Sequence, residues 1–275
     1  MDKSEHYIRT ILISNICKIK HRNIFINFEE EIQIKEVLEF LNKHCTMKII
    51  VNGGTKGIGK EVAIKLAESS ENTIVVTGRS IPELKSISGR YENIIAYNID
   101  LSVIDNQLSA FTAMVSSQLQ KVDILINMAG LLIKKDFSNL TLEETRKMME
   151  TNFFGPSAVI RALFPLMSYR AHIVNISSMG GFQGSSKFRG LSCYSASKAA
   201  LSCLSECLAI EFREAGIKVN CLALGSAETE MFSEAFPSLK ASVTAAEMAE
   251  LIIHFAMNGS KYFNGKVIPV ALESP

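Results

Sequence analysis

The chain contains 275 residues, of which 47% are hydrophobic and 21% are charged. This composition is ordinary for a globular protein and excludes a wholly disordered chain. The 29 basic and 28 acidic residues leave a formal net charge of +1, which provides no overall field to attract nucleic acid or an anionic membrane. No stretch of the sequence reaches the roughly 18 apolar residues of a membrane span. We therefore expect a cytoplasmic protein that binds neither nucleic acid nor membrane.

Cysteine and histidine spacing predicts neither a metal site nor a disulfide framework. None of the six cysteines belongs to a CxxC pair, so all six are expected to be reduced thiols. The five histidines show no HxH or HxxxH spacing, which argues against a zinc site. Cys203 and Cys207 are four residues apart in a helical segment, and we expect both to pack against neighbouring side chains.

Residues 1–46 differ from the rest of the chain, because they are rich in Ile, Lys and Asn and carry no recognisable chemistry. Within them, residues 29–43 have the spacing of one amphipathic helix. At Met47 the sequence changes to short apolar runs that alternate with helical segments. We therefore divide the chain into an N-terminal extension, residues 1–46, that is one helix or disordered, and a folded domain, residues 47–275.

From Met47 onward, short apolar runs alternate with segments of helical length. The runs are rich in β-branched residues, as is typical of parallel strands buried on both faces, and they cover residues 48–54, 73–79, 94–100, 123–130, 172–178, 218–225 and 266–270. The helical segments cover residues 57–69, 105–119, 141–168, 194–215 and 244–257. The alternation predicts an α/β fold with a single Rossmann-type, doubly wound parallel sheet of about seven strands flanked by helices.

The first run leads into the glycine-rich turn NGGTKGIG, residues 52–59, and a helix follows. Gly53 would permit the tight turn, and Gly57 would let the backbone approach a pyrophosphate. Gly59 would let the helix pack closely on the strand. The free N–H groups at the start of the helix would then bind the phosphates, so the turn predicts a dinucleotide site.

The second run ends in Thr77-Gly78-Arg79, without the acidic residue that usually binds the ribose 2′-hydroxyl of NAD. The Arg79 guanidinium could instead bind a 2′-phosphate through paired hydrogen bonds, and Lys56 adds a second cation. This charge pattern favours NADP(H) over NAD(H). The alternative interpretation is that Arg79 and Lys56 are solvated surface residues.

Tyr194 and Lys198 share one face near the start of a predicted helix, because they are four residues apart. A free tyrosine, with a pKa near ~10, exchanges protons poorly at neutral pH. A neighbouring ammonium would lower that pKa and let Tyr194 exchange a proton with a carbonyl or an alcohol. Ser178 ends the preceding strand, at the edge where open α/β sheets bind ligands, and could stabilise charge on a substrate oxygen.

In their order along the chain, these motifs resemble those of the classical short-chain dehydrogenase/reductase family. The resemblance covers residues 47–270, and its elements are the glycine turn, Asp100-Leu101, Asn127-Met-Ala-Gly130, Thr151-Asn152, Ser178, Tyr194 with Lys198, and Gly225-Ser-Ala-Glu-Thr229. It implies that Tyr194 is the general acid/base and that Lys198 holds the nicotinamide ribose. It also implies that Ser178 polarises the substrate carbonyl and that Asn152 positions a water in a proton relay.

The residues of the turn and the resemblance together give a set of expected cofactor contacts: Gly53, Thr55, Lys56, Gly57, Ile58, Gly59, Arg79, Asp100, Leu101, Asn127, Ala129, Gly130, Tyr194, Lys198, Gly225 and Thr229. The sequence departs from the family pattern at three positions. Asn52 replaces the usual Thr, Met128 replaces the second Asn of NNAG, and Leu224 replaces a Pro. None of these departures removes a catalytic group.

Two stretches, residues 180–193 and 226–240, are expected to wall the substrate pocket. The expected lining residues are Phe182, Gln183, Phe188, Met231 and Phe232. The apolar side chains among them either indicate a partly apolar substrate or simply pack, and the sequence favours neither interpretation. Lys187 and Arg189 could attract an acidic substrate, although exposed charged residues are usually solvated.

These observations predict an NADPH-dependent reductase that converts a ketone or aldehyde carbonyl into an alcohol, or catalyses the reverse reaction. An alternative is a non-catalytic NADP(H)-binding regulatory or scaffold protein on the same fold. A sugar-nucleotide epimerase or dehydratase fits less well, since only a few residues follow Val270. The resemblance further implies a homodimer or homotetramer formed through the helical segments 141–168 and 194–215.

Overall fold

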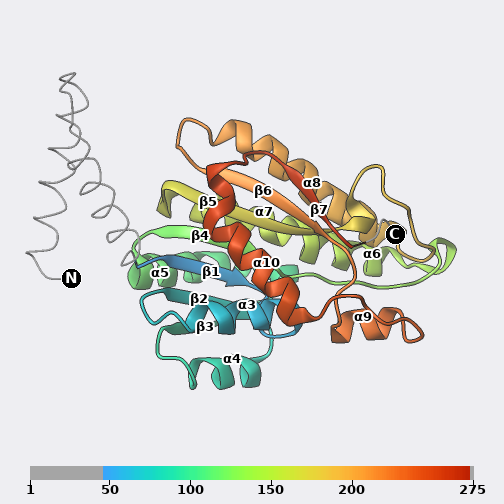
Figure 1. Cartoon of the computed structure of the whole chain (residues 1–275), viewed down its shortest axis with the longest axis horizontal. Helices are drawn as coiled ribbons and strands as arrows, with labels where there is room; N and C mark the ends of the chain where they lie inside the picture. The colour runs from blue at the N-terminus through green and yellow to red at the C-terminus, as the bar shows by residue number, and fades with distance from the viewer. Residues whose placement is uncertain (1–45, 273–275) are drawn as a thin grey trace, which may run out of the picture. The chain divides into compact units, whose positions relative to one another are not determined.

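The structure, a computed structural model, describes residues 46–272. Seven strands form one parallel sheet in the order β3-β2-β1-β4-β5-β6-β7 (Figure 1). The strands are β1 (Lys48–Asn52), β2 (Thr73–Gly78), β3 (Ile94–Asn98), β4 (Val122–Asn127), β5 (Met167–Ser178), β6 (Lys218–Leu224) and β7 (Val267–Val270). The sequence-based prediction of a doubly wound parallel sheet is thereby confirmed. The strand order reverses between β1 and β4, which is where such sheets open a crevice for ligands.

Eight α-helices connect the strands within the described part of the chain. They are α3 (Gly57–Ala67), α4 (Ile81–Ser88), α5 (Leu108–Leu119), α6 (Leu142–Met149), α7 (Gly155–Leu163), α8 (Ser192–Glu211), α9 (Glu230–Ala235) and α10 (Ala245–Asn258). Short 3-10 helices include η1 (Leu101–Asn106) after β3 and η5 (Met179–Gly181) after β5. A π-helical turn, η3 (Glu150–Phe154), joins α6 to α7.

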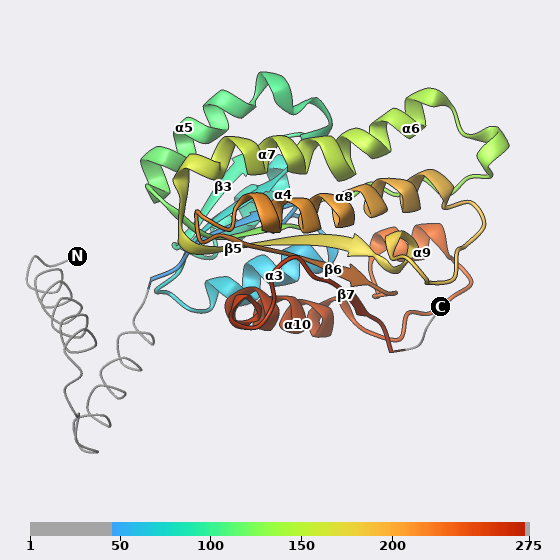
Figure 2. The same cartoon turned by 90° about the horizontal axis from the view of Figure 1, so that it is seen from above.

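The sheet separates two hydrophobic cores, and α3 and α10 lie on the opposite side of it from α5, α7 and α8 (Figure 2). Strand β1 contributes to both cores, because alternate side chains of a strand point to opposite faces of the sheet. Ile49 and Val51 pack with α3 and α10, whereas Ile50 packs with α5 and α7. All three side chains are 0% exposed, as expected for a central parallel strand.

The structure corrects the prediction of a single helix over residues 141–168. A capping box between Thr141 and Glu144 starts α6, and the π turn η3 then interrupts the α-helical pattern. Pro165 stands at the end of α7, where its missing N–H prevents the helix from continuing. Strand β5 therefore begins at Met167, earlier than expected.

Two further expectations about helices need correction. Helix α4 was not expected, although Pro82 in its first turn is compatible with a helix start. Cys203 and Cys207 are both exposed, so the expectation that they pack is wrong within the described chain. The reason is the helical period, because the face of α8 that turns toward the sheet is formed by Leu201, Ser205 and Ala209.

No α-helix between residues 46 and 272 is both long enough and apolar enough to cross a membrane. The amphipathic helix expected within residues 29–43 lies outside the described residues.

Candidate active site

The glycine turn between β1 and α3 forms a cradle of backbone groups. Gly53 has a φ of 85°, a value that favours glycine, and its N–H and that of Gly54 both donate to the carbonyl oxygen of Thr77, at 3.0 and 2.9 Å. A Cβ on Gly59 would collide with the carbonyl oxygen of Gly53. Lys56 precedes α3 without a side-chain cap from the described residues, so the first N–H groups of the helix are free for a phosphate. The cradle therefore fits the pyrophosphate of a dinucleotide.

Basic side chains lie beside this cradle. Arg79 follows β2, is exposed, and forms no ion pair with any described residue. Its backbone is fixed by Asn98, whose Nδ2 donates to the carbonyl oxygens of Gly78 and Arg79 at 3.1 and 3.0 Å. Lys56 Nζ lies 2.9 Å from Glu230 Oε2 on α9, and this hydrogen bond raises the pKa of Lys56. Since both partners are exposed, the ion pair is weak and can exchange for another anion.

A cavity of about 1270 Å³ runs along the carboxyl ends of the strands. It is lined by almost all the expected cofactor residues: Gly53, Thr55, Lys56, Gly57, Ile58, Gly59, Arg79, Asp100, Leu101, Ala129, Gly130, Tyr194, Lys198, Gly225 and Thr229. Asn127 is the exception, since it is 0% exposed and its amide bonds to Asn52 and Asn175 behind the wall, at 2.7 Å each. The expectation that its side chain reaches the cavity is therefore corrected.

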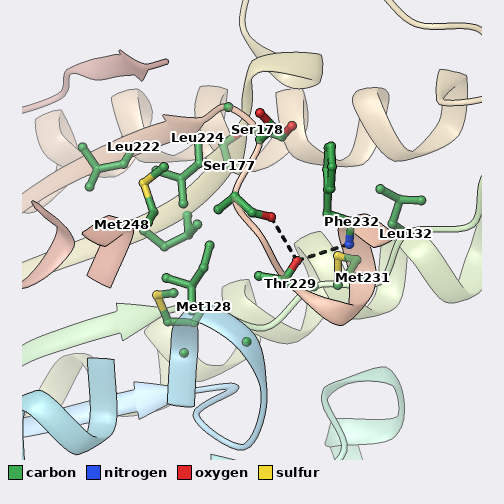
Figure 3. Close-up of a pocket in the computed structure, with 18 of the residues that line it drawn as sticks. Met128, Leu132, Ser177, Ser178, Leu222, Leu224, Thr229, Met231, Phe232 and Met248 are labelled. Atoms are coloured by element: carbon green, nitrogen blue, oxygen red, sulfur yellow. Dashed lines mark hydrogen bonds between the residues drawn. The ribbon is translucent and has the colours of Figure 1, made fainter. Parts of the chain in front are cut away.

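Three of the four expected catalytic side chains meet in this cavity. Ser178 ends β5, Tyr194 lies in the first turn of α8, and Lys198 follows one turn later. All three line the cavity. Figure 3 shows Ser178 at the edge of the pocket, with Phe232 and Met231 across from it. Parallel β5 and the following helix thus bring a hydroxyl, a phenol and an ammonium to one end of the sheet.

Burial controls the protonation of this group. Desolvation raises the pKa of Tyr194, and a hydrogen bond with Ser178 opposes that shift. Desolvation also lowers the pKa of Lys198 to about 8, while its Nζ donates to the carbonyl oxygen of Ile176 at 2.8 Å. The expectation that Lys198 lowers the pKa of Tyr194 is therefore corrected, because desolvation raises that pKa. The phenol of the ligand-free protein is protonated at neutral pH, which is the form that can donate a proton.

Asn152 lies in the π turn and is 0% exposed. Its Oδ1 accepts from the N–H of Leu131 at 2.7 Å, and its Nδ2 donates to the carbonyl oxygen of Leu131 at 2.9 Å. The same Nδ2 donates at 2.8 Å to Ser197, whose hydroxyl donates at 2.7 Å to the carbonyl oxygen of Tyr194. The side chain thus ties the loop after β4 to the helix that carries Tyr194. Its expected role in a water relay stays a prediction.

The expected substrate residues separate into two groups. Phe188, Met231 and Phe232 line the cavity. Phe182 and Gln183 do not, because the 3-10 turn η5 redirects the chain after Ser178 and leaves Gln183 exposed. This part of the expectation is corrected.

Sequence reasoning missed several lining residues. The missed residues include Leu131 and Leu132 after β4, Leu222 on β6, Met248 on α10 and Ile268 on β7, and Thr151 in the π turn was recognised only as part of a motif. In the sequence, the apolar lining residues cannot be distinguished from ordinary core residues, because no pattern separates the two groups. No group of three or more His, Cys, Asp or Glu side chains that could hold a metal ion occurs among residues 46–272.

Comparison with known proteins assigns this arrangement to a family. A family model described as short chain dehydrogenase matches residues 47–240. The chain therefore belongs to the short-chain dehydrogenase family.

Individual relatives agree with that assignment. Dehydrogenase/reductase SDR family member 7B of Mus musculus is 35% identical over 193 residues, which cover 66% of this chain and 58% of the mouse protein. The match thus spans less than two thirds of that relative's length. The 3-oxoacyl-[acyl-carrier-protein] reductase FabG of Aquifex aeolicus is 27% identical over 237 residues, covering 80% of this chain and 94% of that protein.

Solved structures share the fold. The Pseudomonas aeruginosa RhlG/NADP active-site complex is similar with a TM-score of 0.73 and 25% sequence identity, over 82% of this chain and 94% of that chain.

Proposed function

We propose that the domain of residues 47–275 is an NADP(H)-dependent oxidoreductase that reduces a ketone or aldehyde carbonyl to an alcohol, or catalyses the reverse reaction. The observation that carries the proposal is the convergence of Ser178, Tyr194 and Lys198 on the cavity that begins at the glycine turn. Membership of the short-chain dehydrogenase family supports it. The intact set of reactive groups argues against the non-catalytic alternative.

Each group has a distinct role in this proposal. The nicotinamide, when bound, supplies or accepts the hydride. Tyr194 donates the proton to the carbonyl oxygen, and its burial keeps it protonated until it reacts. Ser178 donates a hydrogen bond to the same oxygen as negative charge develops there. Lys198 holds ribose hydroxyls, and Asn152 keeps α8 and the loop after β4 in place.

The choice of NADP(H) over NAD(H) follows from the groups after β2. Arg79 is free to pair with a 2′-phosphate, and Lys56 can exchange its exposed partner Glu230 for the same group. No carboxylate ends β2 to repel that phosphate, because the strand ends in Gly78 and Arg79 follows. The similar RhlG structure carries NADP and another similar structure carries NADH, so the preference rests on Arg79 and Lys56.

The substrate end of the cavity favours a neutral compound with an apolar body. Phe236 packs on Phe232 and Phe188, with ring centroids 5.4 and 6.3 Å apart, respectively. Two of the nearby cations, Arg189 and Lys134, are already engaged with protein groups. Arg189 pairs with Asp136 through two hydrogen bonds, of 2.8 and 2.6 Å, and Lys134 Nζ lies 4.1 Å from the centre of the Phe236 ring. An acidic substrate would have to displace these contacts.

We also propose that the chain forms a homodimer or homotetramer through α7 and α8. Ile210 on α8 and Phe154 beside α7 are 62% and 49% exposed, respectively, and such apolar side chains are typical of a surface that another copy covers.

The function is tested by replacing Tyr194 with Phe, which keeps the ring and removes the proton donor. We expect the affinity for NADPH to change less than about 2-fold and carbonyl reduction to fall by at least about 100-fold. We also expect the wild-type protein to bind NADPH at least about 10-fold more tightly than NADH, because of the charge-assisted bonds to the 2′-phosphate.

Cofactor fluorescence gives the affinities, and the decrease of NADPH absorbance with a panel of neutral apolar ketones and aldehydes gives the turnover. Full activity of the Tyr194→Phe variant would contradict the mechanism. A wild-type protein that binds NADPH but never oxidises it with any carbonyl compound would instead favour the regulatory or scaffold alternative.

A further inference from the structure

Thr151 carries a hydroxyl that stands out in the described part of the chain. The residue is 8% exposed, and its Oγ1 is the only buried side-chain nitrogen or oxygen among residues 46–272 without a hydrogen-bond partner. The same residue lines the cavity. Buried polar groups in native proteins are almost always paired, so an orphan at a cavity wall indicates a partner that binds there.

Other helical hydroxyls of this protein bond back to their own helix. Thr112 donates to the carbonyl oxygen of Leu108 at 2.8 Å, and Thr145 donates to that of Thr141 at 3.1 Å. Ser205 does the same with Leu201, at 2.8 Å. Thr151 lies in the π turn η3, and its Oγ1 makes no such bond to any described residue. The Thr151 hydroxyl is therefore available to hydrogen-bond a ligand, whereas the hydroxyls of Thr112, Thr145 and Ser205 are already paired.

The position of Thr151 identifies which part of a dinucleotide it meets. The π turn packs against η1, the segment that follows β3. Their approach is so close that a Cβ on Gly155 would lie 2.6 Å from the carbonyl oxygen of Leu101. The ends of β2 and β3 are the adenosine side of a Rossmann-type site, because the ribose 2′-position is recognised at the end of the second strand. Tyr194 and Ser178 mark the opposite, nicotinamide side.

We propose that Thr151 is a cofactor-binding residue whose hydroxyl hydrogen-bonds to the adenosine half of the dinucleotide. The inference rests on the proposed NADP(H) site and adds to it a contact that sequence reasoning did not identify. A hydroxyl can both donate and accept, so it matches a ribose hydroxyl or a polar atom of adenine. The binding of the nucleotide would supply a partner that no residue between 46 and 272 provides.

The test compares Thr151→Val with Thr151→Ser. Valine has nearly the same shape and removes only a hydroxyl that no described group bonds, so the melting temperature of the ligand-free protein should stay unchanged or rise. We expect the dissociation constants of both NADPH and 2′,5′-ADP to increase by about 3- to 10-fold. Thr151→Ser retains the hydroxyl and should bind both nucleotides within about 2-fold of the wild type.

Thr112→Val is the matched control, because it makes the same change on α5 at a hydroxyl that is already paired. Its nucleotide affinities should equal those of the wild type. Isothermal titration calorimetry and thermal unfolding without ligand provide the two readouts.

Three results would overturn the inference. The first is wild-type affinity of Thr151→Val for 2′,5′-ADP, whether or not NADPH binding changes. The second is equal loss of affinity and melting temperature in both Thr151 variants, which would show a packing role. The third is a wild-type protein that binds neither nucleotide, and this result alone would also overturn the proposed function.

Discussion

The ammonium of Lys198 is the most consequential buried charge of the site. It is 3% exposed, and its Nζ donates to the carbonyl oxygen of Ile176 at 2.8 Å. Desolvation lowers its pKa to about 8, so the residue is mostly protonated at neutral pH but loses its proton within an accessible range. Because an ammonium donates three hydrogen bonds and a neutral amine donates fewer, this titration should change how the site binds a ribose.

We therefore expect kcat/KM for NADPH to fall as the pH rises through about 8, since this parameter reports groups of the free enzyme. The profile should change by less than about a third between pH 6.5 and 7.5, where Lys198 is largely charged. It is measured by steady-state kinetics at saturating carbonyl substrate. In Lys198→Arg, the guanidinium stays protonated throughout this range, so any remaining activity should lack the fall. A wild-type profile that stays flat to pH 9.5 would contradict this role of Lys198.

Individual residues show which features of the site could be predicted from the sequence alone. The spacing of Tyr194 and Lys198 and the strand before Ser178 were sufficient to predict that all three line one cavity. The direction of the Tyr194 pKa shift was predicted wrongly, because the sequence reveals a neighbouring charge but not the desolvation that outweighs it. The motif Thr151-Asn152 was recognised, but a role for Thr151 was not predicted for a similar reason, since an unpaired hydroxyl is visible only once its surroundings are known.

At the scale of elements, a row of polar side chains links four adjacent strands to α8. Thr77 Oγ1 donates to Asn52 Oδ1 at 2.9 Å. Asn52 Nδ2 donates to Asn127 Oδ1, and Asn127 Nδ2 donates to Asn175 Oδ1, each at 2.7 Å. Asn175 Nδ2 then donates to Ser205 Oγ on α8 at 2.9 Å. The row crosses β2, β1, β4 and β5 in one register, directly below the glycine turn.

Asn127→Leu should break this row at its centre. Leucine has a similar size but leaves the Asn52 amide and the Asn175 carbonyl oxygen buried without that partner. We expect the free energy of unfolding to fall by roughly 2–4 kcal/mol, since each orphaned group costs about 1–3 kcal/mol. Urea denaturation followed by circular dichroism measures the change. Asn139→Leu, at an exposed asparagine, should stay within about 0.5 kcal/mol of the wild type. A loss below about 1 kcal/mol for Asn127→Leu would show that the row contributes little.

The strands could be predicted from the sequence, whereas the break in one helical segment could not. Seven short runs of β-branched residues located the seven strands of the described sheet, because strands buried on both faces leave a strong apolar pattern. The interruption of segment 141–168 at η3 was not predicted, since a π turn has no composition of its own. Asn127 was assigned to the cofactor, whereas its register places it within the sheet row. Register is a tertiary property that one strand alone does not specify.

At the scale of the whole molecule, His172 connects the sheet to α10. It lies on β5, is 2% exposed, and its Nδ1 is 2.9 Å from the carbonyl oxygen of Ala256. Its Nε2 is 3.0 Å from Nδ2 of Asn220 on β6. Since the Asn220 amide group donates, we assign the neutral tautomer in which Nε2 accepts and Nδ1 donates to Ala256. A second proton on Nε2 would face another donor in a dry environment.

Desolvation lowers the pKa of His172 to about 4, and this shift links global stability to pH. An unfolded histidine binds a proton below a pH of about 6.5, whereas the folded protein resists doing so until the pH nears 4. The unfolded state therefore binds more protons in this window, and the free energy of unfolding must decrease as the pH falls through it. The loss attributable to His172 should reach roughly 3 kcal/mol by pH 4.

The contribution of His172 is isolated by comparing how steeply the free energy of unfolding changes with pH in two proteins, rather than by comparing its absolute values. The free energy of unfolding is measured by urea denaturation at intervals from pH 7 to pH 4 for the wild type and for His172→Gln. The variant cannot titrate at this position, so its stability should decrease less steeply between pH 6.5 and 4, even if it is less stable at pH 7. His254→Gln, at an exposed histidine, should keep the wild-type slope. Parallel curves for His172→Gln and the wild type would mean that other groups control the acid sensitivity of the fold.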